Sequence, residues 1–239
     1  MNMGTIVAIG GGNVAAGETI KIDKTLRWLT GKKKPSMLFI STASPAEPRY
    51  SQSMIHHFSA MGFTVSHLNL ILDGYADSEI RSMIVDSDIV YIGGGDSIRL
   101  YHVLRSMKVD CYLREAYDKG VILAGISAGA MIWFSYGHTD SLSFYTKDWN
   151  YSRFGCLGYI RALFSPHCSG ERRVDLERMY KSGESFPGVA LEDRTAMVYR
   201  DGVCTLIRED DGVNGYVYYP TADGSYKVHI PAEKESFDL

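Results

Sequence analysis

Several features are scarce or absent in this sequence of 239 residues, and each absence excludes a class of function. The four cysteines, Cys111, Cys156, Cys168 and Cys204, show no C-x-x-C spacing. Their scatter argues against a zinc site or a thioredoxin-type pair and fits reduced thiols in the cytoplasm. We therefore expect a cytoplasmic protein with no bound metal ion.

Strong charge and long apolar segments are also missing. The formal net charge is -3, and no basic stripe is present, so a nucleic-acid partner is not expected. No apolar run is long enough to span a membrane. The N-terminus runs into the apolar segment 5–9 without the parts of a signal peptide, so we expect no membrane partner.

The remaining composition is that of an ordinary globular protein, with 45% hydrophobic and 22% charged residues. This length suits one α/β domain or two small ones. Because we find no internal repeat, low-complexity tract or clear linker, we treat residues 1–239 as a single domain. Exposed strand edges and aromatic side chains would allow a homodimer, although nothing in the sequence requires one.

The first two-thirds of the chain alternate short apolar runs with amphipathic ones, which predicts a parallel sheet covered by helices. Ligands of such sheets bind beyond the carboxyl ends of the strands. The predicted strands are 5–9, 37–41, 64–70, 89–92 and 121–125. The predicted helices are 19–29, 49–61, 77–85 and 97–119, the last broken near Val109.

The last third has a different pattern. Residues 136–164 are irregular and rich in aromatics, which fits either an active-site wall or packing over the sheet edge. From residue 196 the pattern is that of β-hairpins. The first pairs 197–200 with 203–208 around Asp201-Gly202, and the second pairs 216–219 with 227–230.

A G-x-S-x-G element at residues 125–129 follows the apolar run 121–124 and precedes the helix-compatible run 130–134. A strand, a tight turn and a helix in this order form a nucleophile elbow. The turn would expose the Ser127 hydroxyl, and the new helix would direct free backbone N–H groups toward it. The alternative is an ordinary strand-to-helix connection.

A serine nucleophile needs a base and an acid. His167 follows the stiff Pro166 and is the candidate base, unless it is an ordinary surface or packed histidine. Glu192 and Asp193 end an apolar run and are the candidate acids, unless they form a surface turn. One of the two should face the histidine, because neighbouring side chains in extended backbone point in opposite directions.

An oxyanion needs two hydrogen-bond donors. The first candidate is the N–H of Ala128, directly after the serine, and the second is Gly94 or Gly95, where backbone can approach a ligand closely.

Four segments of the chain, taken in order, resemble peptidase family S51, which includes peptidase E and cyanophycinase. They are the glycine loop 92–96, the elbow 125–130, the histidine segment 165–167 and the acid segment 192–196. The resemblance covers roughly residues 5–208. It implies an α/β three-layer parallel-sheet sandwich like that of class I glutamine amidotransferases, here followed by C-terminal β-hairpins. It also implies a Ser–His–acid peptidase without metal or cofactor.

The resemblance assigns further residues. The acid of the family falls on Asp193, where glutamate is more common, with Glu192 as an alternative and Asp140 as a third option. Arg173 stands where peptidase E has an arginine that binds the acidic side chain of the substrate. Asp96 stands where family members often carry asparagine, and it would add negative charge near the substrate.

The order of the motifs separates two scaffolds. An α/β-hydrolase would use Ser127, Asp193 and then His229, whereas the family order is serine, histidine, acid. We expect hydrolysis of short peptides through an acyl-enzyme, as a dipeptidase or aminopeptidase-like enzyme, with a preference for acidic residues if Arg173 binds them. The alternatives are an esterase or general acyl hydrolase, and a catalytically silent binding protein.

Overall fold

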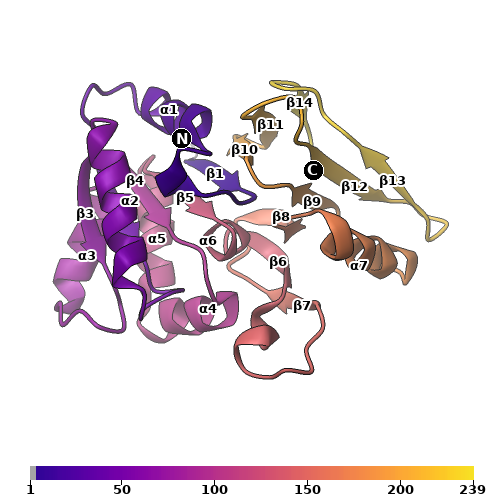
Figure 1. Ribbon diagram of the computed structural model, residues 1–239, viewed down its shortest axis with the longest axis horizontal. Coiled ribbons are helices and arrows are strands. Elements are labelled where there is room, and N and C mark those ends of the chain that lie inside the picture. Colours follow the sequence, from indigo (N-terminus) through magenta and orange to yellow (C-terminus); the bar gives the residue numbers. More distant parts are fainter. Residues whose placement is uncertain (1–3) are drawn as a thin grey trace.

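The parallel sheet predicted from the sequence is present. The computed structural model describes residues 4–239. Five parallel strands lie in the order β1-β5-β4-β2-β3 within an eight-stranded sheet (Figure 1). They are β1 (Thr5–Ile9), β2 (Ser36–Ile40), β3 (Thr64–Leu68), β4 (Ile89–Ile92) and β5 (Ile122–Ile126). All five predicted strands are therefore confirmed.

Three antiparallel strands extend this sheet beyond β1. They are β10 (Thr195–Arg200), β11 (Val203–Arg208) and β14 (Ser236–Phe237). Asp201 and Gly202 have φ values of 53° and 88°, the positive values that a tight hairpin requires. The pairing of β10 with β1 places the loop before β10 beside the carboxyl end of β1, where Ala196 lies opposite Ile9.

Helices cover both faces of the main sheet because its strands bury both sets of alternating side chains. Val7 and Ile9 pack against α1 (Ile20–Leu29) and α2 (Pro48–Ala60). Ile6 and Ala8 face the opposite cluster, which includes α3 (Asp77–Val85), α4 (Ser97–Ser106) and α5 (Val109–Asp118). The predicted break near Val109 is confirmed, since α5 begins at that residue.

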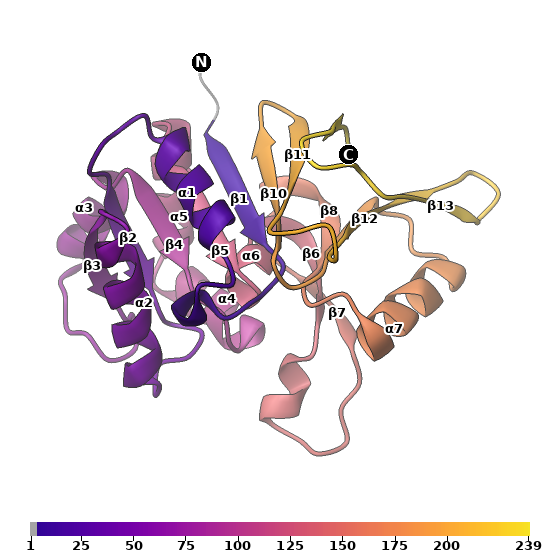
Figure 2. The ribbon, with the colours of Figure 1, turned by 45° about the horizontal axis from the view of Figure 1, so that its top comes forward.

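A second sheet of six strands occupies the last part of the chain, including much of the region expected to be irregular. Its order is β13-β12-β9-β8-β6-β7 (Figure 1), and Figure 2 shows β12, β8, β6 and β7 of this sheet from a second direction. The strands are β6 (Phe134–Thr139), β7 (Ser152–Gly155), β8 (Ile160–Ser165), β9 (Gly188–Leu191), β12 (Gly215–Pro220) and β13 (Tyr226–His229). The second predicted hairpin is therefore confirmed as β12 and β13.

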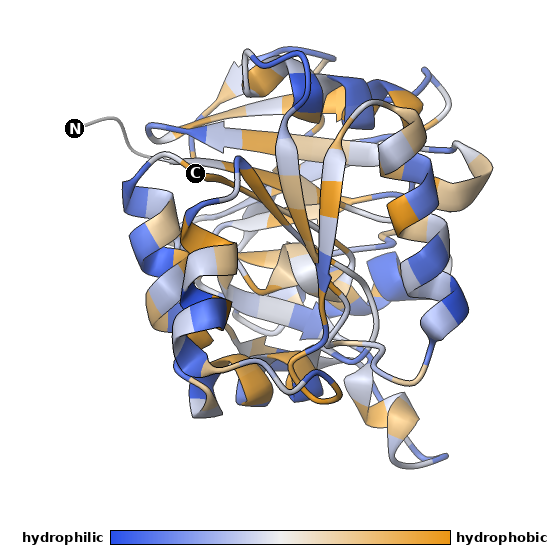
Figure 3. Cartoon of the chain, turned by 90° about the vertical axis from the view of Figure 1, so that its left-hand side faces the viewer, coloured by the Kyte–Doolittle hydropathy of each residue, from blue (hydrophilic) through white to orange (hydrophobic). Residues whose placement is uncertain are grey.

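The second sheet lies between the main core and α7 (Gly170–Lys181). Phe164 and Val217 belong to the cluster that also contains one face of the main sheet. On its other face, Leu163 and Tyr218 pack against Leu176 of α7. Figure 3 shows hydrophobic residues along the inner strands, whereas the surrounding helices carry both hydrophilic and hydrophobic residues.

The helix expected after the serine is shorter than predicted. It consists of the single turn α6 (Ala128–Met131), and β6 begins at Phe134. Phe134 stacks on Phe164 of β8 with ring centroids 4.6 Å apart, so packing within the second sheet overrides local helix propensity. Two 3-10 turns, η1 (Val14–Ala16) and η2 (Ser141–Phe144), complete the elements.

None of the helices formed by residues 4–239 combines the length and the apolar character needed to cross a bilayer.

Candidate active site

Ser127 occupies a strained turn between β5 and α6. Its φ of 55° and ψ of -115° lie outside the regions that side chains favour, which is typical of a nucleophile elbow. Its N–H donates to the Ile9 carbonyl at 3.0 Å and ties the turn to the end of β1. Gly129 is required by close packing, because a Cβ there would lie 2.0 Å from the Ile92 carbonyl oxygen.

His167 reaches the serine from the carboxyl end of β8. Its Nε2 lies 2.8 Å from the Ser127 Oγ. The backbone of His167 is also unusual, with a φ of 49°, and its N–H donates to the Gly10 carbonyl at 3.2 Å. The ends of β1, β5 and β8 are thus joined at one point by backbone hydrogen bonds.

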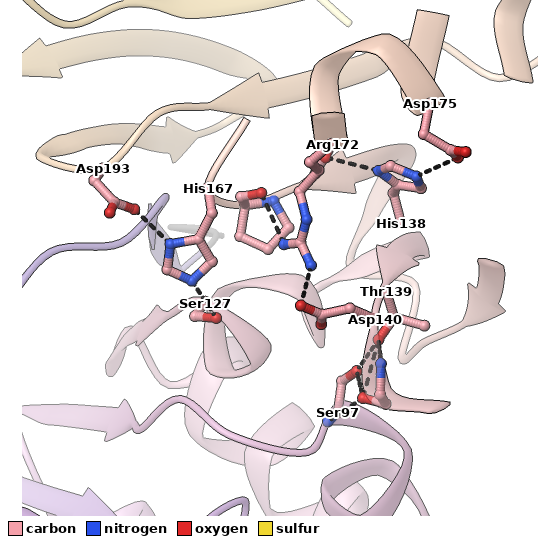
Figure 4. Close-up of polar contacts among 12 residues, drawn as sticks. Ser97, Ser127, His138, Thr139, Asp140, His167, Arg172, Asp175 and Asp193 are labelled. Atoms are coloured by element: carbon pink, nitrogen blue, oxygen red, sulfur yellow. Dashed lines mark hydrogen bonds and ion pairs between the residues drawn. The ribbon is translucent and has the colours of Figure 1, made fainter. Parts of the chain in front are cut away.

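Asp193 lies on the opposite side of the imidazole, in the loop between β9 and β10. Its Oδ1 accepts a hydrogen bond from Nδ1 of His167 (Figure 4). This hydrogen bond lowers the pKa of Asp193, so the carboxylate is ionised. Because an ionised carboxylate only accepts, the proton of His167 lies on Nδ1, and Nε2 can accept the proton of Ser127. Gly11 permits the pairing, because a Cβ there would lie 2.0 Å from Oδ1 of Asp193.

The other two candidate acids have different partners. Glu192 accepts hydrogen bonds from the Asn214 N–H at 2.8 Å and from the Tyr216 hydroxyl at 2.9 Å, on the side of β12. Asp140 forms an ion pair with Arg172, with 2.6 Å between Oδ2 and the guanidinium nitrogen. Of the three carboxylates, the structure brings Asp193 to the histidine.

The α/β-hydrolase arrangement is not formed. His229 lies on β13 at the edge of the second sheet, where its Nε2 is 2.9 Å from Glu235. Asp193 contacts His167 instead.

The glycine loop after β4 lies beside the serine. A Cβ on Gly94 would be 3.8 Å from the Ser127 Oγ. The Gly94 N–H already donates to the Tyr50 hydroxyl at 3.1 Å. Within residues 4–239, the N–H groups of Gly95 and Ala128 have no hydrogen-bond acceptor.

Asp96 and Arg173, both expected to bind substrate, are engaged elsewhere. Asp96 is fully buried and caps α4 by accepting hydrogen bonds from the Ile98 and Arg99 N–H groups at 3.0 and 3.1 Å. Arg173 lies over the Tyr216 ring, 4.0 Å from its centroid, and its Nε is 3.2 Å from Glu177. No hydrogen bond or ion pair among residues 4–239 joins either side chain to Ser127 or His167.

A pocket of about 460 Å³ opens beside the imidazole. Its size falls in the range of small-ligand sites. It is lined by Ile126, His167, Asp193, Tyr50, Ser53 and Met54, together with the segment 12–15 and Glu18. Across residues 4–239, no group of three or more His, Cys, Asp or Glu side chains is arranged to hold a metal ion.

Two residues near the site were not predicted from the sequence to have a role there. Tyr50 is one, because nothing in its helical context indicates a contact with a glycine loop 44 residues away. Arg172 is the other, and it is 4% exposed, whereas the neighbouring Arg173 is the one that the motif singles out. The first turn of α7 holds a buried arginine beside a half-exposed one, and only helix packing distinguishes them.

Fold and site together define an α/β protein with a serine–histidine–aspartate set at the carboxyl edge of its parallel sheet. The chain belongs to peptidase family S51, whose sequence profile matches residues 6–207. It is 30% identical over 218 residues to the uncharacterized peptidase YgaJ of Bacillus subtilis (strain 168), covering 90% of this chain and 91% of that protein. These two matches make the chain a peptidase.

Two solved structures share the fold. A peptidase from an acI-B1 Actinobacterium superposes with a TM-score of 0.75 at 18% identity, over 100% of this chain and 98% of that one. A putative peptidase E protein from Listeria monocytogenes EGD-e gives a TM-score of 0.67 at 16% identity, over 87% and 100% of the two chains. The predicted α/β sandwich of the peptidase E type is therefore confirmed.

Proposed function

We propose that the protein is a serine peptidase that hydrolyses short peptides through an acyl-enzyme. The observation that carries the proposal is the continuous chain of contacts from the Ser127 Oγ to His167 and on to Asp193, in a member of a peptidase family. A nucleophile, a base and an orienting acid in hydrogen-bond reach are what acyl transfer by serine requires.

In the acylation step, the Ser127 Oγ attacks the scissile carbonyl carbon while His167 Nε2 takes the hydroxyl proton. The new C–O bond forms, the C–N bond then breaks, and the imidazolium gives its proton to the leaving amine. Water repeats the sequence on the ester and releases the acid. Asp193 stabilises the imidazolium in both halves and keeps the Nδ1 proton in place.

The oxyanion formed in each half lies near the start of α6. We assign its donors to the N–H groups of Ala128 and Gly95, since the Gly94 N–H donates to Tyr50. Backbone donors fixed by a turn need no reorganisation during the reaction, which makes them effective.

We infer that the substrate is a short peptide with its first residue in the pocket of about 460 Å³ beside His167. A volume of this size suits one or two residues rather than a folded chain. Of the residues within 4–239 that line the pocket, none is a lysine or an arginine, and Arg173 is paired with Glu177. We therefore propose that an acidic side chain is not required.

The test is digestion of a library of short peptides by the wild type and by Ser127→Ala, with products sequenced by mass spectrometry. His167→Gln is tested beside its matched control His229→Gln, which changes a histidine on β13 that pairs with Glu235. We expect cleavage by the wild type and the control, and a loss of several orders of magnitude in the two site variants.

Three outcomes would count against the proposal. Normal peptide turnover by Ser127→Ala would remove the serine from the mechanism. Faster turnover of p-nitrophenyl esters than of any peptide at matched concentration would favour the esterase alternative, and an absence of both activities would favour a silent binding protein.

A further inference from the structure

Two buried polar side chains near the site have no part in the proposed chemistry. Arg172 is 4% exposed and His138 is 0% exposed. Burial of such groups is costly unless they are paired, so each must be held by specific partners. Each of them has one partner in the short segment Ser165-Pro166, which directly precedes His167.

Arg172 binds the main chain of this segment. One guanidinium nitrogen donates to the Pro166 carbonyl at 2.9 Å, and the other is 2.6 Å from Oδ2 of Asp140 (Figure 4). The guanidinium also lies over the Tyr151 ring, 4.9 Å from its centroid. These contacts join the guanidinium to Pro166, Asp140 and the Tyr151 ring, so we treat Arg172 as a structural cation.

His138 contacts the side chain of Ser165 in the same segment. Its Nε2 is 3.1 Å from Oδ1 of Asp175, and its Nδ1 is 3.0 Å from the Ser165 Oγ. Because an ionised carboxylate only accepts, Nε2 carries the proton and Nδ1 accepts from the serine hydroxyl. Burial lowers the pKa of His138, which keeps this neutral arrangement in place.

Both contacts originate from one helix. Arg172 and Asp175 are three residues apart in the first turns of α7, so they share a helix face. That face meets β8 where the strand ends, with Arg172 on the carbonyl of Pro166 and Asp175 acting through His138 on Ser165. The segment is thus held at two successive residues.

We propose that Arg172 and His138 are positioning residues that hold His167 in register with Ser127. The proposal rests on the function proposed above. His167 has a φ of 49°, a strained conformation that persists only when its surroundings hold it. We call the contacts of Arg172 and His138 with Ser165 and Pro166 the clamp. A displacement of about 1 Å between reacting groups can cost on the order of 100-fold in rate. Loss of the clamp should therefore lower turnover rather than substrate binding.

Four variants test the clamp: Arg172→Met, Ser165→Ala, the intermediate Arg172→Lys, and a control at Arg178. Arg172→Met removes the bond to Pro166, and the Asp140 carboxylate that it leaves unpaired is 44% exposed and remains hydrated. Ser165→Ala removes the contact with His138 without burying any charge. Arg178→Gln is the matched control, because Arg178 also pairs with Asp175 on α7 but is 71% exposed and does not reach the segment.

The measurements are kcat and KM on the best peptide, and the rate at which a fluorophosphonate probe labels Ser127, all below the melting temperature of each variant. We expect Arg172→Met to lower kcat and the labelling rate by ~100-fold and Ser165→Ala by ~10-fold, with KM within ~3-fold. Arg172→Lys keeps one donor for Pro166 and should fall between wild type and Arg172→Met. Arg178→Gln should match the wild type.

Other outcomes overturn the inference. Labelling of Arg172→Met and Ser165→Ala at the wild-type rate would show that the clamp contributes to folding alone, and it would leave the serine mechanism intact. A rise in KM at constant kcat would make Arg172 a substrate-binding residue instead. A wild-type protein that is not labelled at Ser127 would overturn the proposed function and this inference together.

Discussion

The choice between Asp193 and Glu192 gives the sharpest prediction. Asp193→Asn keeps the shape of the side chain beside His167 but removes the charge that stabilises the imidazolium. Glu192→Gln makes the same chemical change one residue earlier, where the carboxylate contacts Asn214 and Tyr216. We expect the first variant to lose activity and the second to keep it.

The size of the loss follows from the exposure of the pair. Two unit charges about 4 Å apart attract by about 4 kcal/mol at an effective dielectric constant of about 20, and by about 1 kcal/mol in bulk water. The side chains of His167 and Asp193 are 41% and 54% exposed, which places this pair between those limits. Since about 1.4 kcal/mol is a factor of ten, removal of the charge should lower kcat by ~100-fold. In fully buried triads the loss is ~10⁴-fold, so the effect here should be smaller.

The assay is kcat on a peptide substrate, with fluorophosphonate labelling of Ser127 as an independent readout. Glu192→Gln should keep kcat within ~3-fold and lower the free energy of unfolding by about 1 kcal/mol, because its two hydrogen bonds lose their charge. Asp210→Asn is a control for loss of a nearby negative charge, since Asp210 pairs with Arg194 next to Asp193. An equal loss in Glu192→Gln, or full activity in Asp193→Asn, would refute the assignment.

Three further predictions concern the fold around the site. Gly129→Ala should lower the free energy of unfolding by about 3 kcal/mol in urea titrations, because its Cβ would lie 2.0 Å from the Ile92 carbonyl oxygen, and an unchanged midpoint would contradict this packing. Asp96→Ala should cost about 1–2 kcal/mol of stability through loss of the α4 cap while KM stays constant, so that a raised KM would place Asp96 at the substrate. Burial lowers the pKa of His138 below 6.5, so the unfolded chain takes up the proton first on acidification. The wild type should therefore lose stability relative to His138→Asn as the pH falls from about 6.5, by at most about 1.4 kcal/mol per pH unit in denaturant titrations, and parallel pH curves would contradict this.

The main sheet was predictable because its signals are local. The runs 5–9 and 89–92 are short, apolar and followed by glycine, and they form β1 and β4 with the same bounds. The Asp201-Gly202 pair likewise predicts the hairpin of β10 and β11. These patterns depend on backbone sterics and on burial of both faces of a strand, which neighbouring residues in the sequence reveal.

Four strands of the second sheet, β6, β7, β8 and β9, were not predicted because they are not locally distinctive. β9 has four residues, and the exposed Arg161 interrupts the apolar pattern of β8. Their identity as strands depends on pairing with each other, as where Phe164 meets Val189. The same long-range packing ends α6 after one turn and draws Phe134 into β6.

The sequence by itself determined where a reactive turn would form. The elbow at residues 125–129 follows from local sequence, because an apolar strand run, a serine flanked by glycines and a helix-compatible run follow one another directly. The tertiary structure alone decided which side chains surround Ser127. Asp193 rather than Glu192 meets His167, and Arg172 rather than Arg173 is buried, because α7 and β12 pack against β8 and β9 in one orientation. Which of two adjacent residues with the same charge points toward the site depends on packing between segments that are distant in the sequence.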